Sequence, residues 1–364
     1  MSDPIIFHVD FDYFYAQCEE IRDPLLKTKP VVVCAFSDRG ADSGAVATAN
    51  YTSREYGVKS GMPISLAKKK LLERDDSVFL HTDFDYYANI TNQSMKLMEE
   101  FADIFEYVGR DEAYLDVTQR LDGNFDKSGH FAQQLKNKIR DVVHLTCSVG
   151  ISTNKLISKI ASAYNKPDGL TVVRPNQILT FLEPLNIRDI PHVGSHTYQI
   201  LSDMGVETVG QAREIDIFDL QQKFGRKIGT YIFHSVRGYS TSPVSEKAPN
   251  VQYSKIHTLK QDSLDYDYLS QVVQSICSEI HEIITKNNKM FHTIGLQFVQ
   301  SDLTSKSKSY TTKTFISSKT ELEKITNQLL IYVLNTQQIP FRRIGVRVSD
   351  LSDIQGQTNL STYF

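Results

Sequence analysis

The sequence is poor in cysteine, and none of its cysteines are paired in a motif. The chain of 364 residues has four, Cys18, Cys34, Cys147 and Cys277, and no CxxC occurs. Such wide spacing argues against the usual structural zinc sites and against a dithiol motif. We therefore expect buried, reduced thiols, as in an intracellular protein.

Long hydrophobic runs are also absent. No apolar stretch approaches the roughly 20 residues that span a bilayer. The N-terminal segment MSDPIIFHVDFD has neither the basic region nor the long apolar core of a signal peptide. We expect a cytoplasmic protein that makes no contact with a membrane.

The chain also lacks a strong net charge. Its formal charge is −3, so any surface for nucleic acid must come from local basic patches. With 40% apolar and 23% charged residues the composition is that of a globular protein, and the length allows more than one domain. We find no internal repeat of the length that solenoids use.

The pattern of hydrophobic residues predicts regions that differ in secondary structure. Strands are expected within 4–16, 29–36, 104–118 and 145–152, and helices at 130–143 and 154–165. From about 174 the pattern changes to short helices separated by Gly and Pro. Residues 235–254 are rich in Ser and Pro and predict a linker, which an α+β unit follows.

Carboxylates cluster at two distant places in the chain. Asp10 and Asp12 close the first strand, where alternation puts them on one face, and Asp111 and Glu112 are adjacent in VGRDEAYLDV. Adjacent carboxylates repel each other and lose hydration when buried. Mg²⁺ would offset this repulsion, and two such ions can activate an attacking hydroxyl and stabilise a leaving pyrophosphate. A solvated hairpin turn is the alternative for the Asp-Glu pair taken alone.

Several longer segments carry a family resemblance. They read VDFDYFYA, AVATANYTSREYGVKSGMP, DEAYLD, VGISTNKLISKIAS and NKPDG. In this order they resemble the Y-family translesion DNA polymerases of the DinB type, and the resemblance extends over roughly residues 5–350. It implies an α+β multidomain right-hand polymerase with a ferredoxin-like palm, small fingers, a helical thumb with a helix-hairpin-helix, and an α+β little finger.

The resemblance also implies domain boundaries. The palm would comprise 1–20 and 78–173, the fingers 21–77 and the thumb 174–240. A linker at 241–253 would lead to the little finger at 254–350, and 351–364 would be a flexible tail.

By the same resemblance, Asp10, Asp111 and Glu112 are the catalytic carboxylates that hold the metals, and the carbonyl of Phe11 completes one site. Two Mg²⁺ ions are expected, with Mn²⁺ as the alternative, and Asp12 is expected to be structural. The family usually has Ser two residues before the Asp-Glu pair.

Here the Ser position is Gly109, followed by Arg110. The missing hydroxyl puts a supporting hydrogen bond in doubt. Arg110 could lie near the anionic substrate or face solvent.

The resemblance assigns the incoming nucleotide to polar and cationic side chains, which suit phosphate oxygens. These are Tyr13, Thr48, Tyr51, Arg54 and Lys166, with backbone N–H groups near Phe14. Tyr15 matches the steric gate that excludes a 2′-hydroxyl.

Small residues match the roof over the nascent base pair, namely Ala35, Ala45, Ala47 and Gly61. Such a roof leaves space above the pair and predicts weak shape selection.

Two regions are expected to hold DNA. His192, Val193 and Gly194 would form a hairpin that offers backbone N–H groups to a phosphate. Residues 303–320 contain four Lys and no acid. Alternation along that strand would put Lys306, Lys308 and hydroxyls on one face toward DNA, with Lys313 as a further contact.

The C-terminal QTNLSTYF fits the clamp-binding pattern Q-x-x-L-x-x-Y-F, with Gln357, Leu360, Tyr363 and Phe364 as anchors. Tethering to a sliding clamp would compensate for low processivity.

The sequence thus predicts an error-prone, template-directed DNA polymerase that bypasses lesions. It would act as a monomer on primer–template DNA and dNTPs, and nothing in the chain resembles a proofreading exonuclease. A non-catalytic DNA-binding scaffold and a nucleotide cyclase remain as alternatives.

Overall fold

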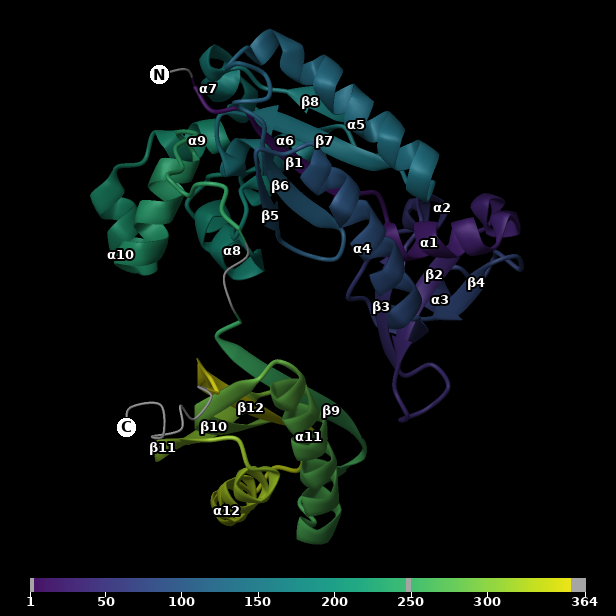
Figure 1. The fold of residues 1–364 in the computed structure, drawn as a ribbon, viewed down its shortest axis with the longest axis vertical. Coiled ribbons are helices and arrows are strands. Elements are labelled where there is room, and N and C mark those ends of the chain that lie inside the picture. Colours follow the sequence, from purple (N-terminus) through teal and green to yellow (C-terminus); the bar gives the residue numbers. More distant parts are fainter. Residues whose placement is uncertain (1–2, 247–249, 355–364) are drawn as a thin grey trace, which may run out of the picture. The chain divides into compact units, whose positions relative to one another are not determined.

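The computed structural model describes residues 3–246 and 250–354 (Figure 1). The chain divides into two compact units, Met1–Ala35 with Ala45–Ala248 and Phe36–Gly44 with Pro249–Phe364. Each unit has a hydrophobic core of its own. None of the helices described combines the length and the apolarity that a bilayer crossing requires.

The first unit is built on a five-stranded sheet of order β5-β6-β1-β7-β8. Its strands are β1 (Ile6–Phe11), β5 (Ile104–Tyr107), β6 (Glu112–Asp116), β7 (Cys147–Ser152) and β8 (Leu170–Val172). β1 is the central strand, with antiparallel partners β6 and β7 on its two sides. Because side chains alternate along a strand, β1 presents two different faces to the layers around it.

One face of β1 is wholly apolar. Phe7, Val9 and Phe11 are buried in a core shared with α4 (Phe84–Glu100) and α5 (Ser128–Val143). The other face carries His8 and Asp10 and meets α6 (Lys155–Tyr164). The sheet therefore keeps its polar chemistry on the side of α6.

A smaller sheet of order β3-β2-β4 lies in the segment predicted as fingers. Its strands are β2 (Val31–Phe36), β3 (Gly44–Ala49) and β4 (Val78–His81), and it is accompanied by α1 (Phe14–Arg22), α2 (Tyr51–Glu55) and α3 (Ile64–Lys70). β4 pairs in parallel with β2, although the sequence placed residues from 78 onward in the palm. The fully buried Val31, Val32 and Val33 of β2 explain this difference, because a buried strand needs hydrogen-bonding partners on both edges.

The segment predicted as thumb is helical, as expected from its Gly and Pro punctuation. It contains α7 (Ile178–Leu182), α8 (Ser195–Asp203), α9 (Val209–Arg213) and α10 (Ile217–Ser235) around a separate core. Beyond α10, the start of the predicted linker packs on the large sheet. Val244 is buried against Ile6 and Tyr114, and the Ser245 N–H donates to Glu106 Oε2 over 3.0 Å.

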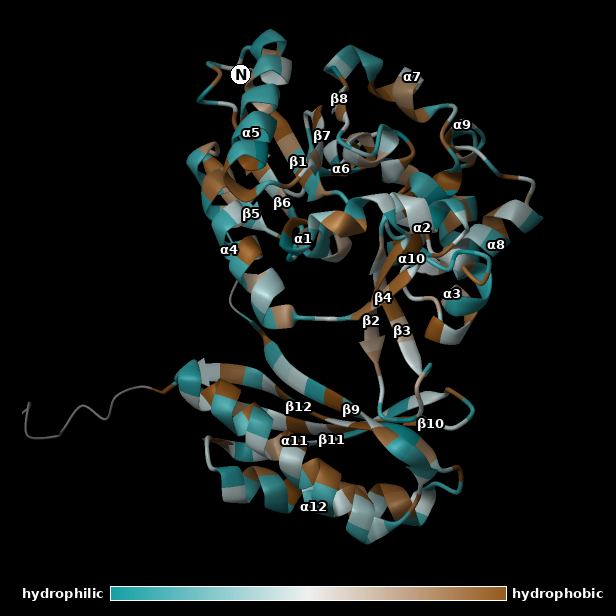
Figure 2. Cartoon of the chain, turned by 90° about the vertical axis from the view of Figure 1, so that its right-hand side faces the viewer, coloured by the Kyte–Doolittle hydropathy of each residue, from teal (hydrophilic) through white to brown (hydrophobic). Residues whose placement is uncertain are grey.

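The second unit is the predicted α+β unit. Its sheet has the order β11-β10-β12-β9, made of β9 (Gln252–Ser263), β10 (Lys289–Gln300), β11 (Ser305–Ile316) and β12 (Phe341–Asp353). The helices α11 (Tyr266–Lys286) and α12 (Lys319–Thr336) lie against one side of the sheet (Figure 2). Since β9 begins at Gln252, this unit takes in the last residues of the predicted linker.

Candidate active site

The strand register brings the distant carboxylates together. Asp10 at the end of β1 is paired directly with Glu112 at the start of β6. The Phe11 N–H donates to the Asp111 carbonyl oxygen over 2.8 Å, which extends the pairing past the strand end. Residues opposite each other in an antiparallel pair point to the same face, so Asp10 and Glu112 share the polar face of the sheet.

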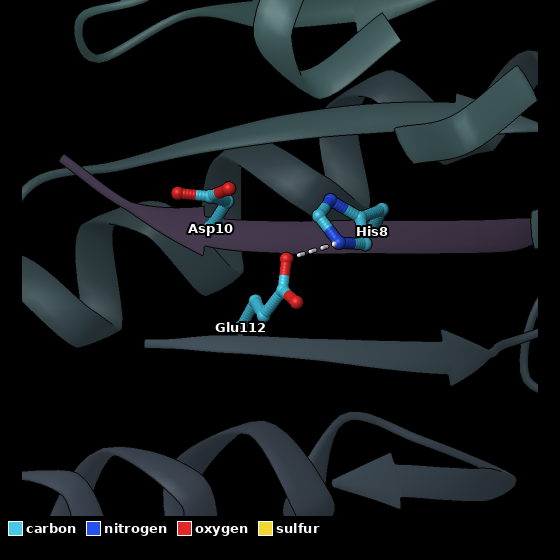
Figure 3. A group of neighbouring side chains, drawn as sticks. All are labelled: His8, Asp10 and Glu112. Carbon is cyan, nitrogen blue, oxygen red and sulfur yellow. Dashed lines mark ion pairs between the residues drawn. The ribbon is translucent and has the colours of Figure 1, made fainter. Parts of the chain in front are cut away.

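Each of these two carboxylates has a cationic partner. Lys166 makes an ion pair with Asp10, and Lys159 on α6 makes one with Glu112. His8 Nε2 lies 3.2 Å from Glu112 Oε2 (Figure 3), and its Nδ1 lies 2.7 Å from Ser162 Oγ. The imidazole is completely buried, so it fixes the position of the Glu112 carboxylate from within the sheet.

The surroundings shift the pKa values of the adjacent Asp111 and Glu112 in opposite directions. The His8 ring and the Lys159 ammonium hold the pKa of Glu112 at about 2. Asp111 as a whole is exposed. Its carboxyl group nevertheless loses hydration to the protein atoms around it, which raises its pKa, and the negative charges of Asp10 and Glu112 raise that pKa further. Burial lowers the pKa of His8. The negative charge of Glu112 therefore disfavours ionisation of Asp111, as expected for adjacent carboxylates.

The cluster suits a divalent cation. Donor atoms of His8, Asp10 and Glu112 lie within 4.8 Å of one another, and no second group of this kind occurs in residues 3–246 and 250–354. Carboxylate oxygens are the ligands that hard cations prefer, and the two lysine contacts show that the site attracts positive charge. Asp111, the third predicted ligand, lies outside this group.

Sequence reasoning missed His8 and Lys159. His8 precedes Asp10 by two residues in the same strand, and that spacing puts both on one face. Lys159 lies in α6, and no local pattern in the sequence links that helix to β6.

Asp12 follows the end of β1 and is fully buried. Its carboxylate bonds Ser148, the residue paired with Asp10, so Asp12 lies on the face of Asp10 as strand alternation predicts. It accepts hydrogen bonds from Ser148 Oγ (2.8 Å), Thr146 Oγ1 (2.9 Å) and the Asp168 N–H (2.8 Å). These contacts agree with the structural role expected for Asp12, and they fasten the loop that carries Lys166.

A buried lysine holds the same loop from the other side. Lys136 Nζ donates to the Gly169 carbonyl oxygen over 2.9 Å and lies 3.0 Å from Asp168 Oδ1. Arg140 pairs with Asp168 Oδ2 at 2.6 Å. The backbone beside Lys166 is therefore held in place by side chains that were not among the predicted site residues.

Three of the residues expected around a triphosphate, Tyr13, Tyr51 and Arg54, contact one another. The Tyr13 and Tyr51 rings meet edge to face at 5.2 Å, and the Arg54 guanidinium lies 4.9 Å from the Tyr51 ring centre. Tyr13 precedes α1 in a left-handed conformation and provides no side-chain cap. The first N–H groups of α1, including that of the buried Phe14, therefore remain available to an anion. Thr48 is buried in β3.

Tyr15 stands on the first turn of α1 with its ring against α4. It stacks on Tyr87 with ring centres 4.5 Å apart and meets Phe84 edge to face at 6.1 Å. The ring is only half-buried, which leaves one side open.

The residues expected to form the roof are small and open to solvent. Ala35 on β2 and Ala45 on β3 are exposed, and Ala47 is half-buried. Gly61 has a φ of 81°, and a side chain built there would meet nothing within 4 Å. Glycine therefore suits both its backbone conformation and the open space beside it.

The predicted hairpin lies between a short helical turn at Ile187–Asp189 and α8. The His192 ring meets Tyr231 of α10 edge to face at 5.6 Å, and Tyr231 donates to the Pro191 carbonyl oxygen over 2.7 Å. Val193 is buried, and exposed Gly194 caps α8 without a side-chain bond. The hairpin is thus fixed by α10, with its backbone at the surface.

The lysines predicted on β11 share a face, but it is not the face of the serine hydroxyls. Lys306 and Lys308 pair with the buried Phe298 and Leu296 of β10, so they lie on the helix side. There Lys306 donates to Gln337 over 2.8 Å, while Lys308 lies 4.3 Å from the Tyr332 ring centre. The period of two in a strand sends the serines to the opposite face. Lys313 is exposed.

The helix-free face of this sheet, which we call the open face, carries two arginines that the sequence did not single out. Arg347 pairs with Gly295, and Arg343 pairs with Val299 and Thr258. The serine hydroxyls of β11 lie on the same face. The predicted clamp-binding residues Gln357, Leu360, Tyr363 and Phe364 lie outside the described residues.

Comparison with known proteins identifies the family. A model described as the impB/mucB/samB family matches residues 9–163, and the model of its C-terminal domain matches 250–361. A model of the thumb domain of DNA polymerase-iota matches 188–239. DNA polymerase IV of Nitrosopumilus maritimus is 57% identical over 364 residues, which is 100% of both chains.

Solved structures agree with this match. The Y-family DNA polymerase chimera Dbh-Dpo4(243-245)-Dbh superimposes with a TM-score of 0.89 at 32% identity, over 96% of this chain and 99% of that chain. An insertion ternary complex of Dbh DNA polymerase gives 0.69, also at 32% identity and over the same shares. The chain belongs to the impB/mucB/samB family and, within it, to the Y-family DNA polymerases of the DinB type. This confirms the predicted right-hand fold class, and the family's use of divalent metal ions agrees with the carboxylate cluster.

Proposed function

We propose that this Y-family DNA polymerase copies damaged templates by two-metal-ion nucleotidyl transfer, with Asp10, Asp111 and Glu112 as the metal-holding side chains. The observation that carries this proposal is the register of β1 and β6, which sets Asp10 directly opposite Glu112. Its substrates are primer–template DNA and dNTPs, and the reaction releases pyrophosphate. The scaffold alternative loses support because every predicted carboxylate is present, and family membership argues against a cyclase.

The proposed metal site uses three carboxylates and one backbone carbonyl. Asp10 and Glu112 come from paired strands, Asp111 stands at the mouth, and the Phe11 carbonyl completes the set. When bound, two Mg²⁺ ions activate the primer 3′-hydroxyl and stabilise the leaving pyrophosphate. Mn²⁺ has the same preference for carboxylate and carbonyl oxygen. His8 keeps Glu112 oriented toward this site, because the buried imidazole lies 3.2 Å from it.

The chain's own groups bind the triphosphate beside this site. Arg54 offers a planar fork to phosphate oxygens, and Lys166 supplies a point charge from its anchored loop. The hydroxyls of Thr48 and Tyr51 are further donors, as is that of Tyr13 when it exchanges Glu20 Oε2, to which it donates over 3.1 Å, for a phosphate oxygen. The N–H groups at Phe14 extend the cradle. This set accounts for how the nucleotide is oriented for in-line attack.

Two features set the selectivity that we propose. Tyr15 stands as a wall against the sugar and excludes a 2′-hydroxyl. The small roof residues leave room above the base pair, so selection by shape is weak and distorted templates are accepted. The result is an error-prone polymerase without proofreading.

DNA is held by three elements on this proposal. The thumb hairpin at His192, Val193 and Gly194 offers backbone N–H groups other than that of Val193, which donates to the Ile190 carbonyl oxygen over 3.1 Å. Exposed Lys313 of β11 adds charge. Arg343 and Arg347 on the open face, together with the serine hydroxyls, suit phosphate oxygens. The protein acts as a monomer, and the QTNLSTYF sequence supports binding to a sliding clamp.

Primer extension across an abasic site tests the proposal. We expect wild-type protein with Mg²⁺ to extend past the lesion and Glu112→Ala to fail. Asp103→Asn is the matched control, because the Asp103 carboxylate accepts hydrogen bonds from the Gln119 and Arg120 N–H groups, beyond the end of β6 that is remote from Glu112. Equal extension by wild type and Glu112→Ala would refute the role of Glu112, and no extension by wild type with a clamp present would refute the function.

A further inference from the structure

Arg110, the residue before the catalytic pair, is attached to α4 although its side chain is exposed. Its carbonyl oxygen accepts a hydrogen bond from Thr91 Oγ1 over 2.9 Å. Its guanidinium carbon lies 5.0 Å from the Phe84 ring centre, and Nη1 lies 3.4 Å from the Phe84 carbonyl oxygen. Main chain and side chain of Arg110 are therefore both tied to one helix.

The ring of Tyr15 rests on the same part of α4. Tyr87 stacks under it with an interplanar angle of 17°, and Phe84 meets its edge at 79°. Burial raises the pKa of the Tyr15 hydroxyl, and the charge of the Arg110 guanidinium opposes that rise. Phe84 contacts both the Arg110 guanidinium and the edge of the Tyr15 ring, so it links the two residues.

These contacts restrain Tyr15 on two sides. Stacking on Tyr87 limits tilting, Phe84 limits sliding along the helix, and Arg110 holds Phe84 in place. An aromatic ring excludes the 2′-hydroxyl of a ribonucleotide by steric overlap only if the ring keeps its position when the ribonucleotide binds. The strength of discrimination therefore depends on how firmly the ring is held, and Arg110 is the exposed and polar member of its surroundings.

We propose that Arg110 is a specificity-determining residue that fixes the Tyr15 ring against α4 and thereby sharpens discrimination between deoxyribonucleotides and ribonucleotides. The inference rests on the proposed role of Tyr15 as the wall against the sugar. It answers the question that the sequence left open, because Arg110 acts through Tyr15 rather than as a free surface charge or a direct phosphate ligand.

Single-nucleotide incorporation on undamaged primer–template tests this, with kcat and KM measured for a dNTP and for the matching rNTP. We expect Arg110→Met to lower the dNTP/rNTP ratio of kcat/KM about fivefold, the scale of one exposed cation–π contact. The change should come from better rNTP use, with dNTP use nearly unchanged. Arg22→Met is the matched control, because Arg22 also packs on an α4 ring, 3.8 Å from the centre of Tyr86.

Two further variants separate the possible outcomes. Phe84→Leu removes the ring that contacts both Arg110 and Tyr15, so it should lower the ratio at least as much as Arg110→Met, and the double variant should lower it no further than Phe84→Leu alone. Additive effects, an unchanged ratio in Arg110→Met, or loss of dNTP use at an unchanged melting temperature would overturn the inference. If Arg110→Met does not fold, Arg110→Gln, which also removes the charge, replaces it with the same criteria. Should Tyr15→Ala leave discrimination intact, the proposed role of Tyr15 itself would fail, which is a distinguishable result.

Discussion

The polar face of the large sheet and the open face of the second sheet are both set by strand alternation, but their charged residues are held differently. On the first, Asp10 and Glu112 each have a fixed cationic partner, and a buried His8 holds one of them. On the second, Arg343 is exposed and paired with Thr258, on the face that also carries the serine hydroxyls of β11. Chemistry on a single bond needs carboxylates fixed within a fraction of an ångström, whereas holding a varied DNA backbone needs adaptable charge.

The difference predicts where single substitutions are costly. A site whose members restrain one another should lose function when any supporting residue is removed. A surface of independent charges should lose affinity in small steps. Each of the following variants tests one side of that contrast.

The largest effect is expected at His8. His8→Phe keeps a planar ring, somewhat larger than imidazole, but removes the contact with Glu112, and loss of such a supporting partner costs about 10- to 100-fold in activity. Because the nucleotide cradle is untouched, the fall should appear in kcat and not in the KM for dNTP. Single-turnover kinetics with His8→Gln alongside measures it, and an unchanged kcat in both variants would contradict the role.

Asp12 should matter chiefly for stability. Asp12→Ala leaves three buried or half-buried donors without their acceptor, which should lower the free energy of unfolding by about 2–3 kcal/mol. The loop of Lys166 would also loosen, so the KM for dNTP should rise. Urea unfolding measures the first effect. Wild-type stability together with a normal KM would show that the loop is held by Lys136 and Arg140 alone.

The open face should respond in small, salt-dependent steps. Arg343→Gln and Arg347→Gln should each reduce the slope of log affinity against log salt by about 1, with the same loss on every DNA sequence. Lys308→Gln is the matched control, because Lys308 lies on the helix side near Tyr332. Fluorescence anisotropy at several salt concentrations measures this. A larger loss for Lys308→Gln would show that DNA follows the other face.

The smallest effect is expected at Gly109. A Cβ there would lie 3.5 Å from Asp111 Oδ1 and 3.6 Å from Glu112 Cγ, which is ordinary contact. Gly109→Ser should therefore fold normally and keep activity within about twofold, since its hydroxyl can donate to Asp111 without displacing it. Steady-state kinetics measures this, and a severe loss would mean that the glycine is required for the geometry of the pair.

Local sequence patterns predicted much of this architecture. The features that they missed all depend on contacts between segments far apart in the chain. Asp10, Asp111 and Glu112 were identifiable from a strand pattern and from motif resemblance. The pairing of β4 with β2, the role of His8 and the contact of Lys159 with Glu112 depend on contacts between distant segments. Lys306 and Lys308 illustrate the limit, because alternation assigned them a common face but not which face the helices cover.

The central claim, that carboxylates from β1 and β6 hold two divalent ions, is tested most directly by counting bound metal. Mn²⁺ paramagnetic resonance would be used on complexes with a dideoxy-terminated primer, template and a non-hydrolysable dNTP. The account predicts two ions per wild-type protein, two in His8→Phe, and fewer in Asp10→Asn and in Glu112→Ala. Two ions in Asp10→Asn and Glu112→Ala alike, or a loss in His8→Phe equal to theirs, would contradict it.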